Sequence, residues 1–294
     1  TCGNPCPVVD RKTGVILLLM THNLGTDGEK AIIHGTSAGT RTVWICRSAD
    51  NGVSWSVPRE ITSEVKDPSW GWDATGPGIG IQMLHGPHAG RLVIPADFSY
   101  RDTTADGKLS YQYGSCSFYS DDDGRTWHGG GTIIPKVNEC QVAELPGKKG
   151  ILMMNMRAYF GRHCRAIAVS TDGGVQWTPP RDAPQLTEPV CQGSFLLYHG
   201  RSRGAGDCLL FLNPASTTSR SRMTLRASFD GGRSWPAAKL LCAGPSAYSS
   251  RTELPSGDIG TLYESGAGTP YEYIVFQTIK PRELFRGTGR GAKK

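Results

Sequence analysis

The stretch Ser120–Trp127, SDDDGRTW, decides the fold because it recurs three more times along the chain. The other copies run from Ser48 to Trp55, from Ser170 to Trp177 and from Ser228 to Trp235. Each copy follows a run of alternating apolar residues, as expected for a strand that enters a tight turn. A single Asp-Gly turn is common in hairpins. Four copies behind four strands predict a repeat architecture built from β-hairpins.

Each conserved place in this repeat, here called the Asp box, has a structural explanation. The Asp in the third place can accept hydrogen bonds from turn amides, and the Gly in the fifth can adopt a positive φ. The final Trp can bury a large face, so we expect every box Trp to be buried. We therefore expect structural rather than catalytic roles for the four box aspartates, Asp50, Asp122, Asp172 and Asp230.

The composition is that of an ordinary globular protein. Of the 294 residues, 38% are hydrophobic and 20% charged, and there are 38 glycines and 19 prolines. Such counts suit many turns between short strands. The longest apolar run, Val15–Met20, is far shorter than the roughly 18 to 20 residues of a membrane span. We therefore expect no membrane span.

The net charge of +6 comes partly from a basic, glycine-rich C-terminal tail, residues 282–294. We interpret this tail as a solvated terminus and expect no nucleic-acid partner. The nine cysteines are an odd number without the spacing of metal sites. Cys46, Cys116 and Cys208 lie inside apolar strand patterns, so we expect buried free thiols. The cellular compartment is left open.

The spacing of the boxes predicts the architecture. The copies start 72, 50 and 58 residues apart, and four short strands per unit at such spacing are typical of propeller blades. A parallel β-helix is the alternative, but its repeats are much shorter. We count four full blades and three strands of a fifth within one domain, residues 1–281. The abrupt start at Thr1 suits an all-β, six-bladed propeller whose first blade is largely missing, with a five-bladed ring as the other option.

Residues with chemistry are expected on the inner strands of the blades and at the ends of those strands. Glu139 is an acid in an otherwise apolar run, and Tyr248 starts the inner strand of the fifth blade. Arg157 and Arg222 are cations at strand boundaries of successive blades. Each alone has an ordinary explanation, as a solvated charge or a packed aromatic ring. Their convergence on one axis indicates a site.

The whole chain resembles the Asp-box exo-α-sialidases, the neuraminidases of bacteria and animals. The most specific motifs are GNPCPVVD from Gly3, GPG from Gly76 followed by RLVIPA, NECQVAEL from Asn138, NMR ending at Arg157, CQGS from Cys191, AYS around Tyr248 and LYE ending at Glu264. Asp boxes alone also occur in other glycosidases and in non-enzymatic propellers. The combination of Asp boxes with these inner-strand motifs is specific to far fewer proteins.

The resemblance implies a retaining exo-α-sialidase, in which Tyr248 matches the nucleophile and Glu139 the carboxylate that activates it. Sialic acid carries a carboxylate on its anomeric carbon, so a carboxylate nucleophile would approach a like charge. A neutral phenol that is deprotonated during attack avoids this repulsion. Sialidases are a known tyrosine exception among glycoside hydrolases.

The resemblance also implies the groups that bind the substrate, a terminal sialic acid on a glycan. Arg157 and Arg222 match the second and third arginines of the triad that binds the sialic acid carboxylate. Bidentate guanidinium contacts suit such a planar group. Glu264 matches the acid that orients the first arginine of the triad, and Asn4 of the GNPCP motif is implied as substrate-binding. No metal or cofactor is implied, and we expect a monomer.

Two elements of the family pattern have no match in this sequence. In complete family members, the first arginine of the triad and the aspartic acid/base precede the GNPCP motif. Asp10, Asp27 and Asp50 do not fit, because they lie in turns or after that region. General acid catalysis is worth about 10² to 10⁴ in rate, so we expect impaired activity. We also expect a preceding N-terminal piece that supplies both residues.

Two other functions fit part of the pattern. A non-enzymatic Asp-box propeller that binds glycans or proteins would share the boxes, but it would not need Glu139, Arg157, Arg222 and Tyr248 in one place. A transglycosylating enzyme would use the same residues and differ in its contacts with the acceptor.

Overall fold

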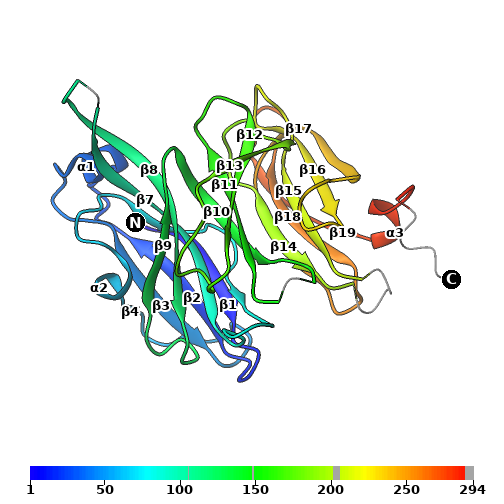
Figure 1. Cartoon of the computed structure of the whole chain (residues 1–294), viewed down its shortest axis with the longest axis horizontal. Helices are drawn as coiled ribbons and strands as arrows, with labels where there is room; N and C mark the ends of the chain where they lie inside the picture. The colour runs from blue at the N-terminus through cyan, green and yellow to red at the C-terminus, as the bar shows by residue number, and fades with distance from the viewer. Residues whose placement is uncertain (105, 148, 201–205, 289–294) are drawn as a thin grey trace. The chain divides into compact units, whose positions relative to one another are not determined.

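The computed structural model describes residues 1–104, 106–147, 149–200 and 206–288. Strands dominate this part of the chain (Figure 1), and its longest helix has six residues. The expectation of an all-β fold without long helices is confirmed. Of the basic tail, Arg290, Lys293 and Lys294 lie outside the described residues.

The first two sheets are antiparallel and follow the chain order. The first has the order β1 (Cys2–Val9), β2 (Ile16–His22), β3 (Thr42–Ser48) and β4 (Arg59–Glu60). The second has the order β5 (Asp73–Thr75), β7 (Leu92–Thr103), β8 (Leu109–Ser120) and β9 (His128–Ile133), and β6 (Ile81–Gln82) also pairs with β7. Two short helices lie in the connections, α1 (Glu29–His34) after β2 and α2 (Thr62–Val65) after β4.

The remaining strands form one sheet of four and one of six. The third sheet has the order β10 (Val137–Glu144), β11 (Leu152–Ala158), β12 (Cys164–Ser170) and β13 (Arg181–Thr187). The last sheet has the order β14 (Ser194–Tyr198), β15 (Cys208–Pro214), β16 (Ser221–Ser228), β17 (Ala237–Glu253), β18 (Ile259–Ser265) and β19 (Tyr273–Ile279). Helix α3 (Pro281–Leu284) follows β19.

Strand β17 joins the fourth and fifth predicted blades. Its first half pairs with β16 up to Pro245, and its second half pairs with β18 from Ser246 onward. The predicted strands of the fifth blade are therefore present. The first of them is continuous with the last strand of the fourth blade rather than separate from it.

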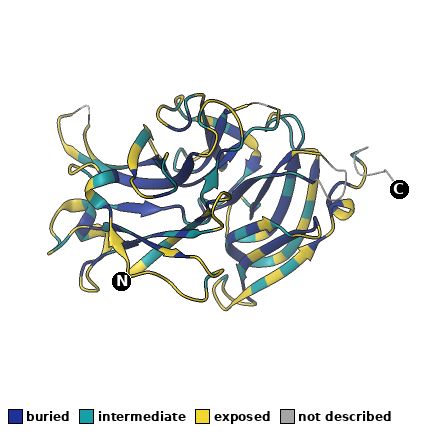
Figure 2. Ribbon diagram, turned by 90° about the horizontal axis from the view of Figure 1, so that it is seen from below, coloured by how far each residue is buried: buried dark blue, intermediate teal, exposed yellow. Residues whose placement is uncertain are grey.

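By their contacts, the residues form two compact units. Unit 1 comprises Thr1–Val142, Gly150–Met156 and Ala168–Pro180, and unit 2 comprises Ala143–Lys149, Arg157–Ile167 and Arg181–Lys294. Burial alternates along the strands (Figure 2), as in β2, where Leu17 and Leu19 are fully buried. Side chains of successive residues point to opposite faces of a strand, so the apolar alternation in the sequence places one face in the core.

The four Asp boxes form the same hydrogen-bonded turn, as the second box illustrates. The hydroxyl of Ser120 accepts a hydrogen bond from the amide of Gly124 (3.0 Å) and donates one to Asp122 (2.8 Å). Asp122 also accepts from the amide of Thr126 (2.9 Å). Burial raises the pKa of Asp122, but the hydrogen bonds from Thr126 and Ser120 lower it to about 2. The charged carboxylate therefore stabilises its own turn, through hydrogen bonds from Ser120 and Thr126.

The box tryptophans differ in burial, which corrects the expectation that all are buried. Trp127 is 2% exposed, Trp177 is half-buried and Trp55 is 41% exposed. The second box packs closely on the first sheet. Gly124 lies so near Leu17 that an added Cβ atom would be 2.4 Å from a methyl group of Leu17. The third box likewise reaches the second sheet. The indole N–H of Trp55 donates a hydrogen bond within its own turn, to the carbonyl of Gly52 (3.1 Å).

All nine cysteines are free thiols, as expected. Cys46, Cys116 and Cys208 are buried within their strands. Burial raises the pKa of the Cys46 thiol, so this side chain acts as a small apolar group.

Candidate active site

Tyr248 lies where strand β17 departs from regular pairing with β18. The register shifts between Ser246 and Ser249, and such bulges re-aim a side chain. The Tyr248 side chain is half-buried, and its backbone amide donates a hydrogen bond to Glu264 Oε2 (3.0 Å). The AYS and LYE motifs are thus joined directly in unit 2.

Arg220, which the sequence interpretation did not select, is the cation beside Tyr248. Its Cζ lies 5.6 Å from the centre of the Tyr248 ring. Its Nη1 donates a hydrogen bond to the hydroxyl of Tyr271 (2.6 Å), and its carbonyl accepts one from the amide of Ser246 (2.9 Å). Within the described part of the chain, no ion pair joins Arg220 to a carboxylate. Its charge is therefore not neutralised by any carboxylate of the described residues.

A second cation, Arg157, is close enough to affect Arg220. Burial lowers the pKa of Arg220, the side chains of Cys191, Tyr271 and Tyr248 raise it, and Arg157 lowers it. The net pKa of Arg220 lies above its usual value. Arg157 is the next-to-last residue of β11. Its side chain is half-buried, and its Cζ lies 5.2 Å from the ring centre of Tyr159. Two guanidinium groups thus share this part of unit 2.

Arg222, which the sequence interpretation selected, has an exposed side chain near the start of β16. Arg222 is exposed and has a φ of 64°, and its carbonyl accepts hydrogen bonds from the Ala215 amide (3.0 Å) and the Thr224 hydroxyl (2.7 Å). The alternation of side chains along a strand could not show which of Arg220 and Arg222 lies near Tyr248, because residues two apart share a face in a regular strand. The irregular pairing between Ser221 and Met223 breaks that pattern.

Arg165 shows the opposite arrangement, a cation that the protein does neutralise. Its Nη1 lies 2.6 Å from Oε2 of Glu188, and both side chains are almost fully buried. Oε1 of Glu188 accepts a hydrogen bond from the amide of Ala158 (2.8 Å). This buried pair thus fixes the backbone next to Arg157.

Glu139 lies on β10 and is 7% exposed. The flanking backbone is fixed on both sides, because the Ser115 hydroxyl donates to the Asn138 carbonyl (2.5 Å) and the Cys140 amide donates to the Gly76 carbonyl (3.2 Å). A Cβ atom on Gly78 would lie 2.3 Å from the Gln141 side chain. The GPG and NECQ motifs are therefore packed together in unit 1.

Asn4 lies on β1 in a left-handed conformation, with a φ of 53°. Its Oδ1 accepts a hydrogen bond from Nη2 of Arg41 (2.6 Å). The same guanidinium bonds to Thr21 and Asn23 and lies 3.8 Å from the ring centre of Trp72. Arg41 thus holds the amide oxygen of Asn4. The sequence pattern gave no signal for this role.

A buried carboxylate lies close to this group of side chains. Asp73 is fully buried, and neither of its oxygens has a hydrogen-bond partner within the described residues. Burial raises the pKa of Asp73 to about 7, although Lys66 and Arg41 lower it. The Lys66 ammonium donates instead to Thr40 and to the carbonyls of Arg41 and Gly71. Asp73 is thus poised between its charged and neutral forms near neutral pH.

The predicted site residues are divided between the two units. Asn4 and Glu139 belong to unit 1, and Arg157, Tyr248 and Glu264 belong to unit 2. A cavity of about 470 Å³ in unit 1, lined by parts of α1, residues 68–71 and the end of β7, contains none of them.

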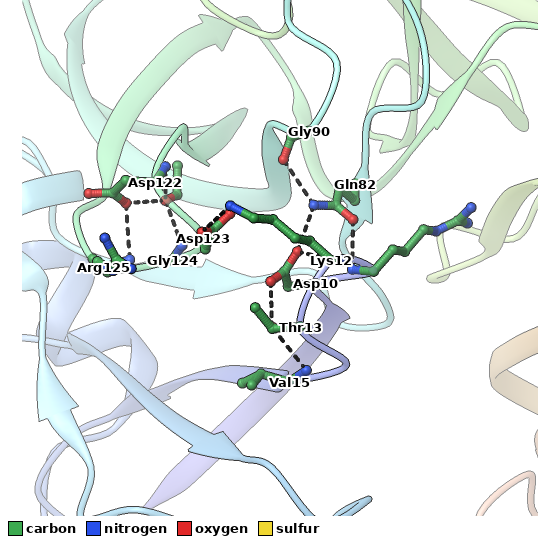
Figure 3. Close-up of polar contacts among 12 residues, drawn as sticks. Asp10, Lys12, Thr13, Val15, Gln82, Gly90, Asp122, Asp123, Gly124 and Arg125 are labelled. Atoms are coloured by element: carbon green, nitrogen blue, oxygen red, sulfur yellow. Dashed lines mark hydrogen bonds and ion pairs between the residues drawn. The ribbon is translucent and has the colours of Figure 1, made fainter.

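The carboxylates considered as substitutes for an acid/base are held in local turns. Asp10 accepts hydrogen bonds from the hydroxyl of Thr13 (2.5 Å) and from the side-chain amide nitrogen, Nε2, of Gln82 (2.9 Å), as Figure 3 shows. Burial raises the pKa of Asp10, but these hydrogen bonds lower it below its usual value. Asp27 accepts from the amides of Ala38 and Gly39, and Asp50 belongs to its box. All three carboxylates thus accept hydrogen bonds that hold them within their own part of the structure.

The described residues contain neither a cluster of metal ligands nor a membrane-spanning helix. Within that part of the chain, no group of three or more His, Cys, Asp or Glu side chains is placed to hold a metal ion. None of its helices combines the length and apolar character needed to cross a membrane.

Comparison with known proteins gives consistent matches. A family described as "BNR repeat-like domain" matches residues 1–261. The chain is 35% identical over 275 residues to a sialidase of Micromonospora viridifaciens, covering 92% of this chain and 41% of that protein. It is 31% identical over 326 residues to sialidase-3 of Mus musculus, covering 96% of this chain and 76% of the relative.

A solved structure agrees with these relatives. The Hadza microbial sialidase Hz136 matches with a TM-score of 0.81 and 34% identity, covering 96% of this chain and 53% of that one. The chain thus spans only about half the length of its bacterial relatives. The fold and the family expected from the motifs are confirmed: this chain belongs to the sialidase (neuraminidase) family and has the sialidase type of β-propeller fold.

Proposed function

We propose that the chain carries the catalytic residues of a retaining exo-α-sialidase, which removes terminal sialic acid from glycoconjugates. The observation that carries this proposal is the guanidinium of Arg220 beside the Tyr248 ring, without a carboxylate to neutralise it in the described structure. A half-buried, uncompensated cation favours an anionic ligand. The membership of the sialidase family makes a sialic acid carboxylate the natural choice.

We assign to Arg220, in place of Arg222, the binding of the substrate carboxylate together with Arg157. Both residues belong to unit 2, and Arg157 is near enough to act to lower the pKa of Arg220. A planar carboxylate can accept paired N–H bonds from each of them. Asn4 would contact the sugar through its side-chain amide, whose oxygen Arg41 holds in place. Glu264 accepts a hydrogen bond from the Tyr248 amide through Oε2, and in this proposal its other oxygen, Oε1, binds a further cation.

Tyr248 acts as the nucleophile in this proposal. Its phenolic oxygen bonds to the anomeric carbon while the glycosidic C–O bond breaks, and Glu139 takes the phenolic proton. The positive charge of Arg220 near the ring stabilises the negative charge that develops on the phenol. Water then attacks the anomeric carbon as the bond to Tyr248 breaks; Glu139 returns its proton to the phenol, and the proton lost by the attacking water passes to solvent, which balances the leaving group that departed as an anion. The anomeric configuration is retained.

No residue of this sequence is assigned as the acid that protonates the leaving group. We therefore expect activity to be greatest on aryl sialosides, whose phenolate leaves readily without a proton. A non-enzymatic glycan-binding propeller is less well supported, because the relatives that match most of the chain are named sialidases.

Paired variants of the two arginines test this assignment. Binding of 2-deoxy-2,3-didehydrosialic acid is measured by calorimetry for Arg220→Ala and Arg222→Ala. One charge-assisted contact contributes about 1.5 to 3 kcal/mol, so Arg220→Ala should weaken binding by about 10- to 150-fold. Arg222→Ala, whose side chain is exposed, should leave affinity unchanged. The opposite ranking would return the role to Arg222.

A further inference from the structure

The turn between β18 and β19, residues 266–272, is held rigidly by its own side chain. The carboxylate of Glu272 accepts hydrogen bonds from three amides, Ala267 (2.9 Å), Gly268 (2.9 Å) and Thr269 (2.8 Å). These bonds lower the pKa of Glu272 below its usual value. A Cβ atom on Gly266 would lie only 1.9 Å from the Thr269 carbonyl oxygen. The turn therefore has one compact conformation.

This turn presents Tyr271 to the anion-binding arginine. The Tyr271 side chain is 59% exposed, yet its hydroxyl accepts a hydrogen bond of 2.6 Å from Nη1 of Arg220. A phenol fixes the direction of a guanidinium without cancelling its charge. Glu188, in contrast, neutralises Arg165 within the protein. Arg220 is thus anchored and still charged.

We propose that Tyr271 is a positioning residue for Arg220, and that the turn capped by Glu272 pre-organises the carboxylate site. This inference rests on the proposed function, because it requires Arg220 to bind the substrate carboxylate. In this inference, the hydrogen bond from Arg220 to Tyr271 holds the guanidinium in the direction in which its other N–H groups bind the substrate carboxylate. Pre-organisation of this kind raises affinity by lowering the entropy lost on binding.

The expected effect on affinity is modest and specific. Because Tyr271 does not itself contact the substrate, we take the smaller range of a hydrogen bond between neutral partners, a factor of about 2 to 12 in an equilibrium constant, as the effect of its loss on binding. Tyr271→Phe should therefore weaken binding of 2-deoxy-2,3-didehydrosialic acid by about 2- to 12-fold. KM for an aryl sialoside should rise by a similar factor with little change in kcat, because ground state and transition state both carry the carboxylate.

Three comparisons separate positioning from a general structural effect. Tyr273→Phe is the matched control, since Tyr273 lies on β19 and is similarly exposed, at 51%. It should change neither affinity nor KM. The methyl ester of the same analogue has no carboxylate, so Tyr271→Phe should leave its binding unchanged. Glu272→Ala should also weaken binding of the acid, but it should add little in a Tyr271→Phe background, because both changes release Arg220.

The outcomes distinguish this inference from the proposed function. If the unmodified chain binds the acid and its ester equally, or cleaves no aryl sialoside, the proposed function fails and the inference fails with it. If the chain prefers the acid but Tyr271→Phe behaves as Tyr273→Phe does, only the positioning role is wrong. Equal losses for acid and ester in Tyr271→Phe would also overturn it, by showing that the turn supports the fold rather than the charge.

Discussion

Breaking the buried ion pair between Arg165 and Glu188 should destabilise the protein strongly. The charged atoms lie 2.6 Å apart, and the side chains are 0% and 1% exposed. Glu188→Gln keeps the shape and an acceptor for the Ala158 amide, but it leaves a buried guanidinium without its counter-charge. Such a change costs about 3 to 5 kcal/mol. Urea unfolding followed by circular dichroism measures it.

The exposed pair of Arg162 and Asp182, 2.5 Å apart and 59% and 31% exposed, is the matched control. Surface pairs contribute about 0 to 1 kcal/mol, so Asp182→Asn should have little effect. The pKa of Glu188 lies above its usual value, because the effect of burial exceeds the opposite effect of Arg165. Burial thus disfavours the charged carboxylate even beside its partner. The double variant Arg165→Met, Glu188→Gln should therefore be more stable than Glu188→Gln alone. A cost for Glu188→Gln no larger than that of Asp182→Asn would refute this reasoning.

Three further results are expected. The folded-state pKa of Asp122 is about 2, below the usual value near 3.9, so its box contributes stability that is present above about pH 4 and is lost as the pH falls towards 2. Acid unfolding should therefore begin at a higher pH in Asp122→Asn, and an unchanged midpoint would contradict this. Asp73 has the opposite shift, to about 7, so the charged form opposes folding as the pH rises from about 4 to 7. Asp73→Asn should then stabilise the protein more at pH 8 than at pH 5, and equal effects at both would rule this out. Trp127→Ala should destabilise by about 3 to 5 kcal/mol because Trp127 is 2% exposed, whereas Trp55→Ala, at 41% exposure, should cost clearly less. A comparable urea midpoint for the two would contradict the packing of the boxes.

The features that follow local rules could be predicted from the sequence. Each Asp box carries its own turn chemistry, so its four repeats predicted hairpins, antiparallel sheets and a propeller. Apolar alternation likewise predicted the strands, for example Leu17 and Leu19 on the buried face of β2. The exposure of Trp55 could not be predicted in the same way. It depends on whether a neighbouring sheet lies against the box, and the box sequence itself carries no such information.

The candidate site likewise combines features that the local sequence predicts with features that depend on how the strands assemble. The acid of NECQ and the tyrosine of AYS lie at recognisable strand positions, and their motifs single them out. The choice between Arg220 and Arg222 depends on irregular pairing after Ser221, which alternation cannot reveal. The partnerships of Asn4 with Arg41 and of Arg220 with Tyr271 join residues 37 and 51 positions apart. Such contacts arise only when the sheets are assembled.

The most direct test of the proposed mechanism is to trap the covalent intermediate. A 3-fluorosialyl fluoride carries a fluoride leaving group that departs without an acid, and its C3 fluorine slows hydrolysis of the intermediate. After incubation with the chain, peptide mass spectrometry should locate one fluorosialyl group on Tyr248, and Tyr248→Phe should carry none. A label on another residue, or turnover of an aryl sialoside by Tyr248→Phe, would show that Tyr248 is not the nucleophile.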